Sequence, residues 1–148
     1  MRAWRIVKAK HAATAFSGEG ARLYGGRWNS AGVSLVYASG SKALAALESL
    51  VHLNPPVLFT YAAIPIEFEA ALVEKASALP PGWADSPAPP STQSIGDLWV
   101  QEARSAVLEL PSVIIPTEAN YLLNPAHPGF AQILFGQPEP FAFDPRLL

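Results

Sequence analysis

Proline is the residue that most restricts how this chain can fold, because fifteen of its 148 residues are proline, about twice the usual share. Prolines crowd the stretch PPGWADSPAPP, residues 80–90, and recur along the C-terminal third. Proline has no backbone N–H to donate and is excluded from the interior of helices and of central strands. The sequence therefore favours many short elements joined by turns over a helical bundle.

The order of the remaining segments predicts a single α+β domain, residues 1–148, with a mainly antiparallel sheet and a few helices. The stretch VSLVYAS, residues 33–39, is β-branched and aromatic and predicts a strand, whereas the polar, glycine-rich stretch 11–32 predicts a long loop. The other elements expected are a strand at 4–10, a helix at 41–53, one or two strands within 57–74, a loop at 80–93, a helix within 94–106, a strand-like segment at 107–116, turns with a short apolar segment at 120–136, and a last edge strand within 140–148.

Composition excludes several classes of protein. Ten Lys and Arg against twelve Asp and Glu give a net charge of −2 without a basic run, which argues against direct nucleic-acid binding. No cysteine is present and the three histidines show no metal-ligand spacing, so neither disulfides nor a metal site are expected. Residues 1–10, MRAWRIVKAK, lack the apolar core of a signal peptide, and no apolar run approaches the ~18 residues of a membrane span, so we expect a cytoplasmic protein without membrane contact.

The loop YGGRWNSAG, residues 24–32, carries a cation beside two glycines. The guanidinium of Arg27 presents a rigid fork of donors that fits phosphate oxygens, and the glycines let backbone N–H groups approach the same anion. An arginine that ties down loop carbonyls explains the pattern equally well. Trp28 is expected to anchor the loop in the core.

The predicted helix carries one carboxylate beside its apolar side. Ser41 is a good N-cap, and Glu48 falls between Leu44 and Val51 on the helical wheel. A carboxylate half shielded from water acts more strongly on a nearby cation. From periodicity alone, an ordinary surface pair between Glu48 and His52 is the favoured interpretation.

Three further polar residues stand at the ends or faces of predicted elements. Strand alternation places Tyr37 on one face with Leu35 and Ser39, where it could line a cleft, although spacing alone favours a packed core tyrosine. Ser112 follows a proline and Asn124 precedes one, and spacing alone favours turn contacts for both.

The segments GGRWNSAGVSLVYAS, ALAALESLVHL, LPSVIIPTEANYLLNPAHP and FAFDPRLL, in this order, resemble the RES-domain family. The resemblance runs over nearly the whole chain, although residues 67–93 carry no matching motif. The family is named for an arginine, a glutamate and a serine, which match Arg27, Glu48 and Ser112.

The resemblance implies a fold similar to ADP-ribosyltransferase toxins and NAD+ as the substrate. RES proteins are toxins of bacterial toxin–antitoxin pairs, and an Xre-type antitoxin binds the toxin and blocks its active site. Some members hydrolyse or phosphorolyse NAD+, and others pass ADP-ribose to a protein acceptor. The sequence does not choose among these acceptors, and a non-catalytic nucleotide- or protein-binding module with the same fold is the alternative.

The resemblance also implies roles for the matching residues. NAD+ cleavage leaves an oxocarbenium-like ribose, which needs a fixed anion near the sugar and a hold on the pyrophosphate but neither a metal nor a thiol. Arg27 is therefore assigned to the pyrophosphate, Glu48 to the nicotinamide ribose, and Tyr37 to packing against nicotinamide or ribose. Ser112 would contact the cofactor or position Glu48. The further candidates for contact with the ligand or support of its loop are Asn124, Asn29 and Tyr24.

Overall fold

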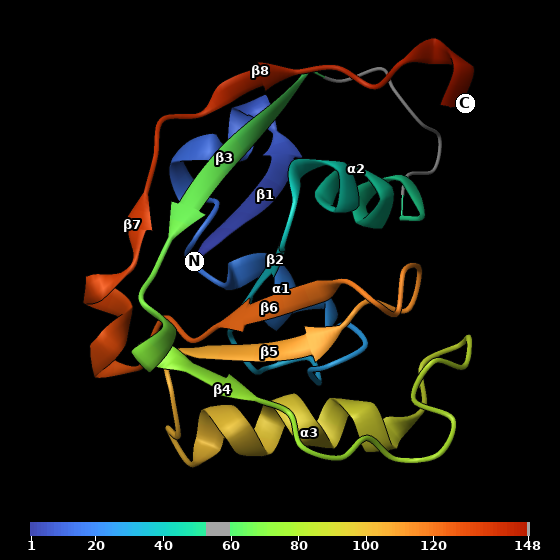
Figure 1. Cartoon of the computed structure of the whole chain (residues 1–148), viewed down its shortest axis with the longest axis vertical. Helices are drawn as coiled ribbons and strands as arrows, with labels where there is room; N and C mark the ends of the chain where they lie inside the picture. The colour runs from blue at the N-terminus through green and yellow to red at the C-terminus, as the bar shows by residue number, and fades with distance from the viewer. Residues whose placement is uncertain (53–59, 148) are drawn as a thin grey trace.

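The computed structural model describes residues 1–52 and 60–147, and in these ranges eight strands form one sheet. Neighbouring strands run antiparallel except for the parallel pair β4–β5, so the predicted mainly antiparallel α+β fold is confirmed (Figure 1). The strands are β1 (Arg2–Lys8), β2 (Val36–Ser39), β3 (Tyr61–Glu67), β4 (Val73–Lys75), β5 (Val107–Pro111), β6 (Ala119–Leu123), β7 (Leu134–Phe135) and β8 (Glu139–Phe141). The helices are α1 (Glu19–Tyr24), α2 (Lys42–Leu50) and α3 (Pro90–Gln101).

The sheet has the order β4-β5-β6-β2-β1-β3-β7, with β8 also beside β3, and it is weakly joined between β1 and β2. These two strands share a single residue pair, Trp4 with Ser39, whereas β1 pairs with β3 along its whole length and β2 pairs with β6 along its whole length. The two halves of the sheet therefore diverge at β1 and β2. Figure 1 shows β1, β3 and β8 in the upper part of the molecule and β4, β5 and β6 in the lower part.

The alternation along β2 divides its side chains between two hydrophobic clusters. Val36 and Ala38 belong to the cluster that also contains Ile66 of β3, whereas Leu35 and Tyr37 pack with the cluster around Trp99 of α3. The predicted alternation of faces is thus confirmed. Because the second cluster lies between α3 and the lower half of the sheet, α3 is fixed against β5 and β6.

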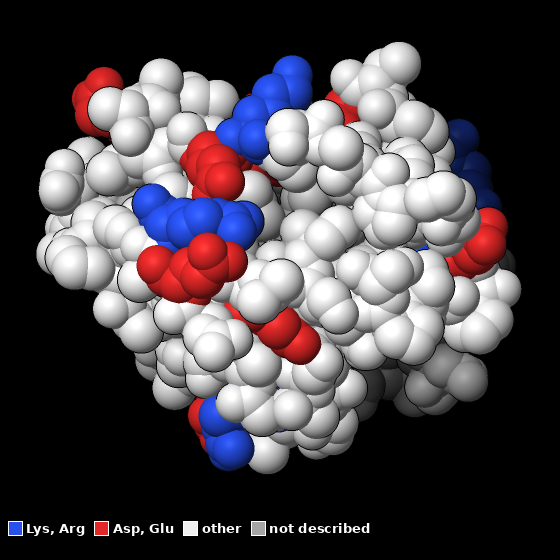
Figure 2. Space-filling model, turned by 90° about the horizontal axis from the view of Figure 1, so that it is seen from below, with Lys and Arg blue, Asp and Glu red and all other residues white. Residues whose placement is uncertain are grey.

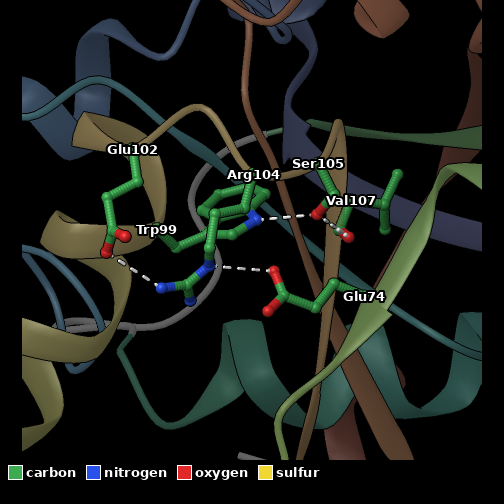
Figure 3. A network of polar contacts seen from close by, with 6 residues as sticks. All are labelled: Glu74, Trp99, Glu102, Arg104, Ser105 and Val107. Atoms are coloured by element: carbon green, nitrogen blue, oxygen red, sulfur yellow. Dashed lines mark hydrogen bonds and ion pairs between the residues drawn. The ribbon is translucent and has the colours of Figure 1, made fainter.

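Polar contacts fix the C-terminal end of α3 to the lower strands (Figure 3). Trp99 Nε1 donates a hydrogen bond of 2.8 Å to Ser105 Oγ, and this hydroxyl donates one of 2.8 Å to the carbonyl oxygen of Val107. Arg104 bonds Glu74 of β4 at 3.2 Å and Glu102 at 3.1 Å. The helix is therefore connected to both β4 and β5, away from the β1–β2 junction.

Several predicted boundaries differ from the structure. The stretch 11–32 is not a continuous loop, because it holds part of the 3-10 helix Ala9–Thr14 and all of α1. Helix α3 begins at Pro90 rather than 94, since proline is tolerated in the first turn. The sequence predicts turns with a short apolar segment at 120–136, yet the first residues of this stretch belong to β6, a central strand. Strand β1 begins at Arg2, two residues earlier than expected.

The helix predicted from Ser41 is confirmed as α2, and the Ser41 side chain accepts a hydrogen bond of 3.0 Å from the backbone N–H of Leu44. Val51 was expected on its apolar side, but α2 ends at Leu50 and Val51 is exposed. The parts of the predicted helix 41–53, of the strands within 57–74 and of the last strand within 140–148 that fall on residues 53–59 and 148 lie outside the described residues. Within the described ranges, no helix combines the length and hydrophobicity that crossing a bilayer requires.

Charges on the face that carries α3 are sparse and mixed in sign. Figure 2 shows this face largely uncharged, with basic side chains lying beside acidic ones. A DNA- or RNA-binding surface needs a row of cations along the phosphate backbone. No such continuous basic surface is visible on this face.

Candidate active site

A cleft of about 920 Å³ opens where β1 and β2 diverge. Its lining comes from β1, β2, β6, α1, α2, the segments before and after α1, and the segments around residues 86–88 and 113–114. Arg27, Tyr37 and Glu48 all line this cleft, so the structure brings together three of the predicted site residues from separate elements. Ser112, Asn29 and Asn124 are buried and do not line it.

Glu48 faces the interior because of its place on α2. Leu44 and Ala45 are buried, and Glu48 follows them by four and three residues, which puts all three on one side of the helix. Its Oε1 accepts hydrogen bonds of 2.7 Å from Ser112 Oγ and of 2.7 Å from Asn120 Nδ2. In the described part of the chain Glu48 forms no ion pair with His52, so the surface-pair interpretation is wrong.

Ser112 lies in the turn after β5 and is fully buried. Its Oγ accepts hydrogen bonds of 3.1 Å from the backbone N–H groups of Ile114 and Ile115. With both amides donating to it, the hydroxyl directs its own proton to Glu48. Of the two roles predicted for Ser112, positioning of Glu48 is therefore the one that its contacts support.

Asn120 is a site residue that the sequence analysis missed. It lies on β6 directly opposite Ser39 of β2, and both side chains line the cleft. Ser39 Oγ donates a hydrogen bond of 2.8 Å to Asn120 Oδ1, while Nδ2 donates to Glu48. A polar amide at the start of the apolar run NYLL was the signal that could have identified it.

The backbone of the Arg27 loop is tightly folded and requires glycine at two positions. Gly25 has φ of 69°, in the left-handed region that favours glycine. A Cβ atom on Gly26 would lie 2.6 Å from the hydroxyl oxygen of Tyr37. The two glycines therefore permit a turn that brings Arg27 beside Tyr37 and the cleft.

Helix α3 supports this loop through two side chains of its first turn. Thr92 Oγ1 donates a hydrogen bond of 2.7 Å to the carbonyl oxygen of Arg27, and Gln93 Nε2 donates one of 3.2 Å to that of Gly26. Thr92 is completely buried. Helix α3 thus holds the backbone carbonyl groups of both Gly26 and Arg27.

The next turn of α3 also packs against the loop that carries Arg27. Asp97 accepts a hydrogen bond of 2.9 Å from the backbone N–H of Ser30 and one of 2.6 Å from its hydroxyl. Gly96 packs so closely that a Cβ atom there would overlap the carbonyl oxygen of Trp28. Sequence reasoning missed this support, because a glycine inside a helical pattern was the only local sign of a close approach.

The side chain of Arg27 uses only one of its nitrogens. Nη1 donates hydrogen bonds of 2.9 Å to the carbonyl oxygen of Trp83 and of 2.7 Å to that of Asp85, as the alternative of a carbonyl-binding arginine predicts. Nε and Nη2 bond no described residue, and the side chain lines the cleft. Trp28 is buried in the cluster around Trp99, which confirms the prediction of a core anchor.

Tyr37 and Asn29 form a buried contact beneath the loop. The Tyr37 hydroxyl donates a hydrogen bond of 2.6 Å to Asn29 Oδ1 and accepts one of 3.1 Å from the backbone N–H of Trp28. Burial raises the pKa of Tyr37 well above its ordinary value, so the phenol stays neutral. Asn29 Nδ2 donates to the carbonyl oxygens of Ala21 in α1 and of Ser30 and Val33 in the loop. Its side chain is fully buried, so Asn29 supports the loop in this structure.

The last two candidates lie at opposite extremes of exposure. Asn124 is buried in a turn, where its Oδ1 accepts a hydrogen bond of 3.0 Å from the backbone N–H of Ala126. Tyr24 lines the cleft and is 86% exposed. The first therefore supports a turn, and the second forms part of the rim.

Arg5 is a second cation of the cleft that sequence reasoning missed. From β1 its Nη1 donates a hydrogen bond of 2.8 Å to the carbonyl oxygen of Tyr37 on β2, and its Nε donates one of 2.8 Å to that of Ala15. It forms no ion pair with a described carboxylate, and burial lowers its pKa to about 10. Arg5 thus bridges the two halves of the sheet where they share a single residue pair.

Among the described residues, no group of three acidic or histidine side chains could hold a metal ion.

Comparison with known proteins identifies the class to which this fold and cleft belong. The model of the RES domain matches residues 2–144, and the chain belongs to this family. A protein of Yersinia enterocolitica named Toxin Res is 40% identical over 151 residues, covering 99% of each chain. A protein of Sphingobium sp. named Prs ADP-ribosylating toxin is 42% identical over 153 residues, covering 98% of this chain and 95% of that one.

The fold is also that of a solved structure. The crystal structure of the M. tuberculosis MbcT–MbcA toxin–antitoxin complex contains a chain that matches with a TM-score of 0.75. The match covers 95% of this chain and 84% of that chain, at 17% sequence identity. The likeness is therefore one of fold, and it agrees with the α+β class expected from the sequence.

Proposed function

We propose that this chain is the toxin of a bacterial toxin–antitoxin pair and cleaves NAD+ at the bond between nicotinamide and ribose. ADP-ribose would pass to a protein acceptor, to water or to phosphate. The observation that carries the proposal is the cleft, because Arg27 and Glu48, from separate elements, both line it. Its volume of about 920 Å³ lies within the range of about 300–1,000 Å³ typical of small-molecule sites. The name Toxin Res supports the role of a toxin, and the name Prs ADP-ribosylating toxin supports a reaction that uses ADP-ribose.

The position of Glu48 suits the chemistry of glycosidic cleavage. As nicotinamide leaves as a neutral molecule, the ribose carbon takes on positive charge. A carboxylate already held by two hydrogen bonds stabilises that charge without reorganising during the reaction. A module that only bound a nucleotide would have no need of an anion held in this way.

The binding end of the cleft suits a pyrophosphate. Arg27 has Nε and Nη2 available for a bidentate contact, while Nη1 stays on the carbonyls of Trp83 and Asp85. Arg5 adds a second positive charge that has no carboxylate partner among the described residues. Tyr37, whose carbonyl oxygen accepts a hydrogen bond from Arg5, also lines the cleft and would pack against nicotinamide or ribose. Asn29 and Asn124 would act by supporting loops.

The protein partner would be an antitoxin of the Xre type that covers the cleft, and the chain would act in the cytoplasm, where NAD+ is available. A solved structure of similar fold is that of a toxin–antitoxin complex. Exposed Tyr24 and Val51 line the cleft and offer apolar surface to such a partner. Adding the purified antitoxin to the purified chain should therefore inhibit nicotinamide release.

Incubation of the purified chain with NAD+ tests the proposal, with nicotinamide release followed by chromatography. Wild-type protein should release nicotinamide, and a Glu48→Gln preparation made in parallel should not, which excludes a contaminating enzyme. NAD+ labelled in its adenylate part and mixed with cell extract then separates the acceptors. One labelled protein band indicates a transferase, and only small labelled products indicate hydrolysis or phosphorolysis. Absence of nicotinamide release under all these conditions would contradict the proposed function and favour a binding module.

A further inference from the structure

A chain of four hydrogen-bonded side chains lies at the junction of the two sheet halves. It runs from Ser39 through Asn120 to Glu48, and Ser112 joins from the other side. Its members come from β2, β6, α2 and the turn after β5. Ser39 is also the residue of β2 that pairs with Trp4 of β1. The carboxylate is therefore fixed relative to both halves of the sheet.

We propose that Asn120, oriented by Ser39, is a positioning residue that holds Oε1 of Glu48 so that Oε2 is presented to the ribose of bound NAD+. This inference rests on the proposed function, and it adds two residues that the family motif does not name. Asn120 would act through Glu48 and would make no contact with the substrate itself.

The orientation of the Asn120 amide follows from the chemistry of its neighbours. An ionised carboxylate only accepts hydrogen bonds, so Asn120 must offer Nδ2 to Glu48. The reverse orientation would put an amide oxygen against a carboxylate oxygen at 2.7 Å, which is repulsive. Ser39, only 4% exposed, donates its proton to Oδ1 and so selects the productive orientation.

Both donors bind the same oxygen of Glu48. Ser112 Oγ and Asn120 Nδ2 each reach Oε1 at 2.7 Å, and Oε2 accepts no hydrogen bond from a described residue. Two donors on one oxygen restrict rotation of the carboxylate, and Oε2 has no described donor in a side chain that lines the cleft. Preorganisation of this kind acts on the transition state more than on substrate binding.

Kinetics of Asn120→Ala test the positioning role. Loss of a hydrogen bond to a charged group should lower kcat on the order of 10- to 100-fold, with the KM for NAD+ changed by less than about twofold. Ser39→Ala should lower kcat less, because the amide can still reach Glu48. A raised KM with unchanged kcat would mean that Asn120 binds the substrate directly, and an unchanged kcat and KM would remove it from the site. Either result would overturn the inference.

Ser105→Ala is the matched control. Ser105 is another serine with two hydrogen bonds, but it joins Trp99 to Val107 away from the cleft (Figure 3). Its replacement should lower the melting temperature and leave kcat and KM unchanged. A similar loss of kcat in Ser105→Ala would show that lowered stability alone explains the Asn120 and Ser39 variants.

A thermal unfolding cycle tests the contact without any substrate. Asn120→Asp keeps the shape but sets two carboxylates against each other, so it should lower the melting temperature. Adding Glu48→Gln removes this charge repulsion and offers an amide donor to the carboxylate introduced at position 120, but that amide then faces the hydroxyl proton of Ser112, so the double variant should recover part of the loss while remaining inactive. Additive effects in the cycle would contradict the hydrogen bond. If wild-type protein releases no nicotinamide, the proposed function fails, and this cycle still decides whether Asn120 holds Glu48.

Discussion

Glu48 and Arg27 line the same cleft, but the fold holds the two charges in different ways. The carboxylate of Glu48 is fixed by side chains of two other elements, Ser112 and Asn120. For Arg27 it is the backbone that is fixed, by α3, while the guanidinium is attached through one nitrogen to carbonyls of the partly exposed stretch 83–85. A rigid anion suits a group that stabilises a transition state, and a cation with unused donors suits a group that grips a flexible diphosphate.

Among the variants that test this comparison, Glu48→Gln should cause the largest loss of kcat. Removing the charge from a preorganised site is expected to cost about 3–4 kcal/mol of transition-state stabilisation, a loss of kcat on the order of 10²- to 10³-fold. Gln is similar in shape and can still meet Ser112, so the protein should stay folded. Nicotinamide release and circular dichroism measure the two quantities. Turnover within tenfold of wild type would mean that the carboxylate is not the stabilising group.

Gly96→Ala tests the support of the Arg27 loop. Because a Cβ atom at position 96 would overlap the Trp28 carbonyl oxygen, the loop must move away from α3. We expect a loss of about 3 kcal/mol in the free energy of unfolding and a melting temperature lower by about 6–12 °C, with weakened NAD+ binding. Gly20→Ala in α1 is the control, since a Cβ atom there meets nothing within 4 Å. Equal melting temperatures for the two variants would contradict the close approach.

Arg27→Ala should affect binding more than chemistry. Loss of a bidentate contact to the pyrophosphate should raise KM for NAD+ on the order of 10- to 100-fold, with a smaller change in kcat. Arg22→Ala provides a nearby control, because Arg22 forms an exposed pair with Glu19 and does not line the cleft. If Arg27→Ala lowered kcat and left KM alone, Arg27 would act on the reacting centre, and the contrast with Glu48 would disappear.

The smallest expected effect concerns the pH dependence of stability. Burial raises the pKa of Tyr37 well above the value of about 10 for an unfolded tyrosine. The unfolded chain therefore loses this proton above about pH 10 while the folded chain keeps it, and stability falls as pH rises. Tyr37→Phe should weaken that fall in urea titrations at pH 9 to 11, although the contribution of Tyr121, whose pKa burial raises to about 12, remains. If the free energy of unfolding fell equally steeply with pH in wild type and in Tyr37→Phe, the Tyr37 hydroxyl would be exposed to water rather than buried.

Local chemistry made part of this fold predictable. Ser41 caps α2 through a residue three positions away, and the alternation of Val36 and Tyr37 follows from strand geometry alone. The resemblance to a family predicted Arg27 and Glu48 as site residues, and both line the cleft. These predictions needed only short-range patterns or matching motifs.

Long-range contacts made the rest unpredictable from one sequence. Glu48 meets Ser112 and Asn120, which lie 64 and 72 residues further along the chain. Thr92 lies 65 residues from Arg27, the residue whose carbonyl it binds. No periodicity or spacing encodes such partners, so the favoured pairing of Glu48 with its neighbour His52 was wrong. Periodicity describes one element at a time, whereas this site forms between elements.

The most direct measurement is a crystal structure of the Glu48→Gln variant with NAD+ bound. We predict that the pyrophosphate lies against Nε and Nη2 of Arg27, and that the nicotinamide ribose lies within hydrogen-bond reach of the side chain at position 48. NAD+ bound outside the cleft, or bound within it with only one of these two contacts, would contradict the claim that the two charges act on opposite ends of one dinucleotide.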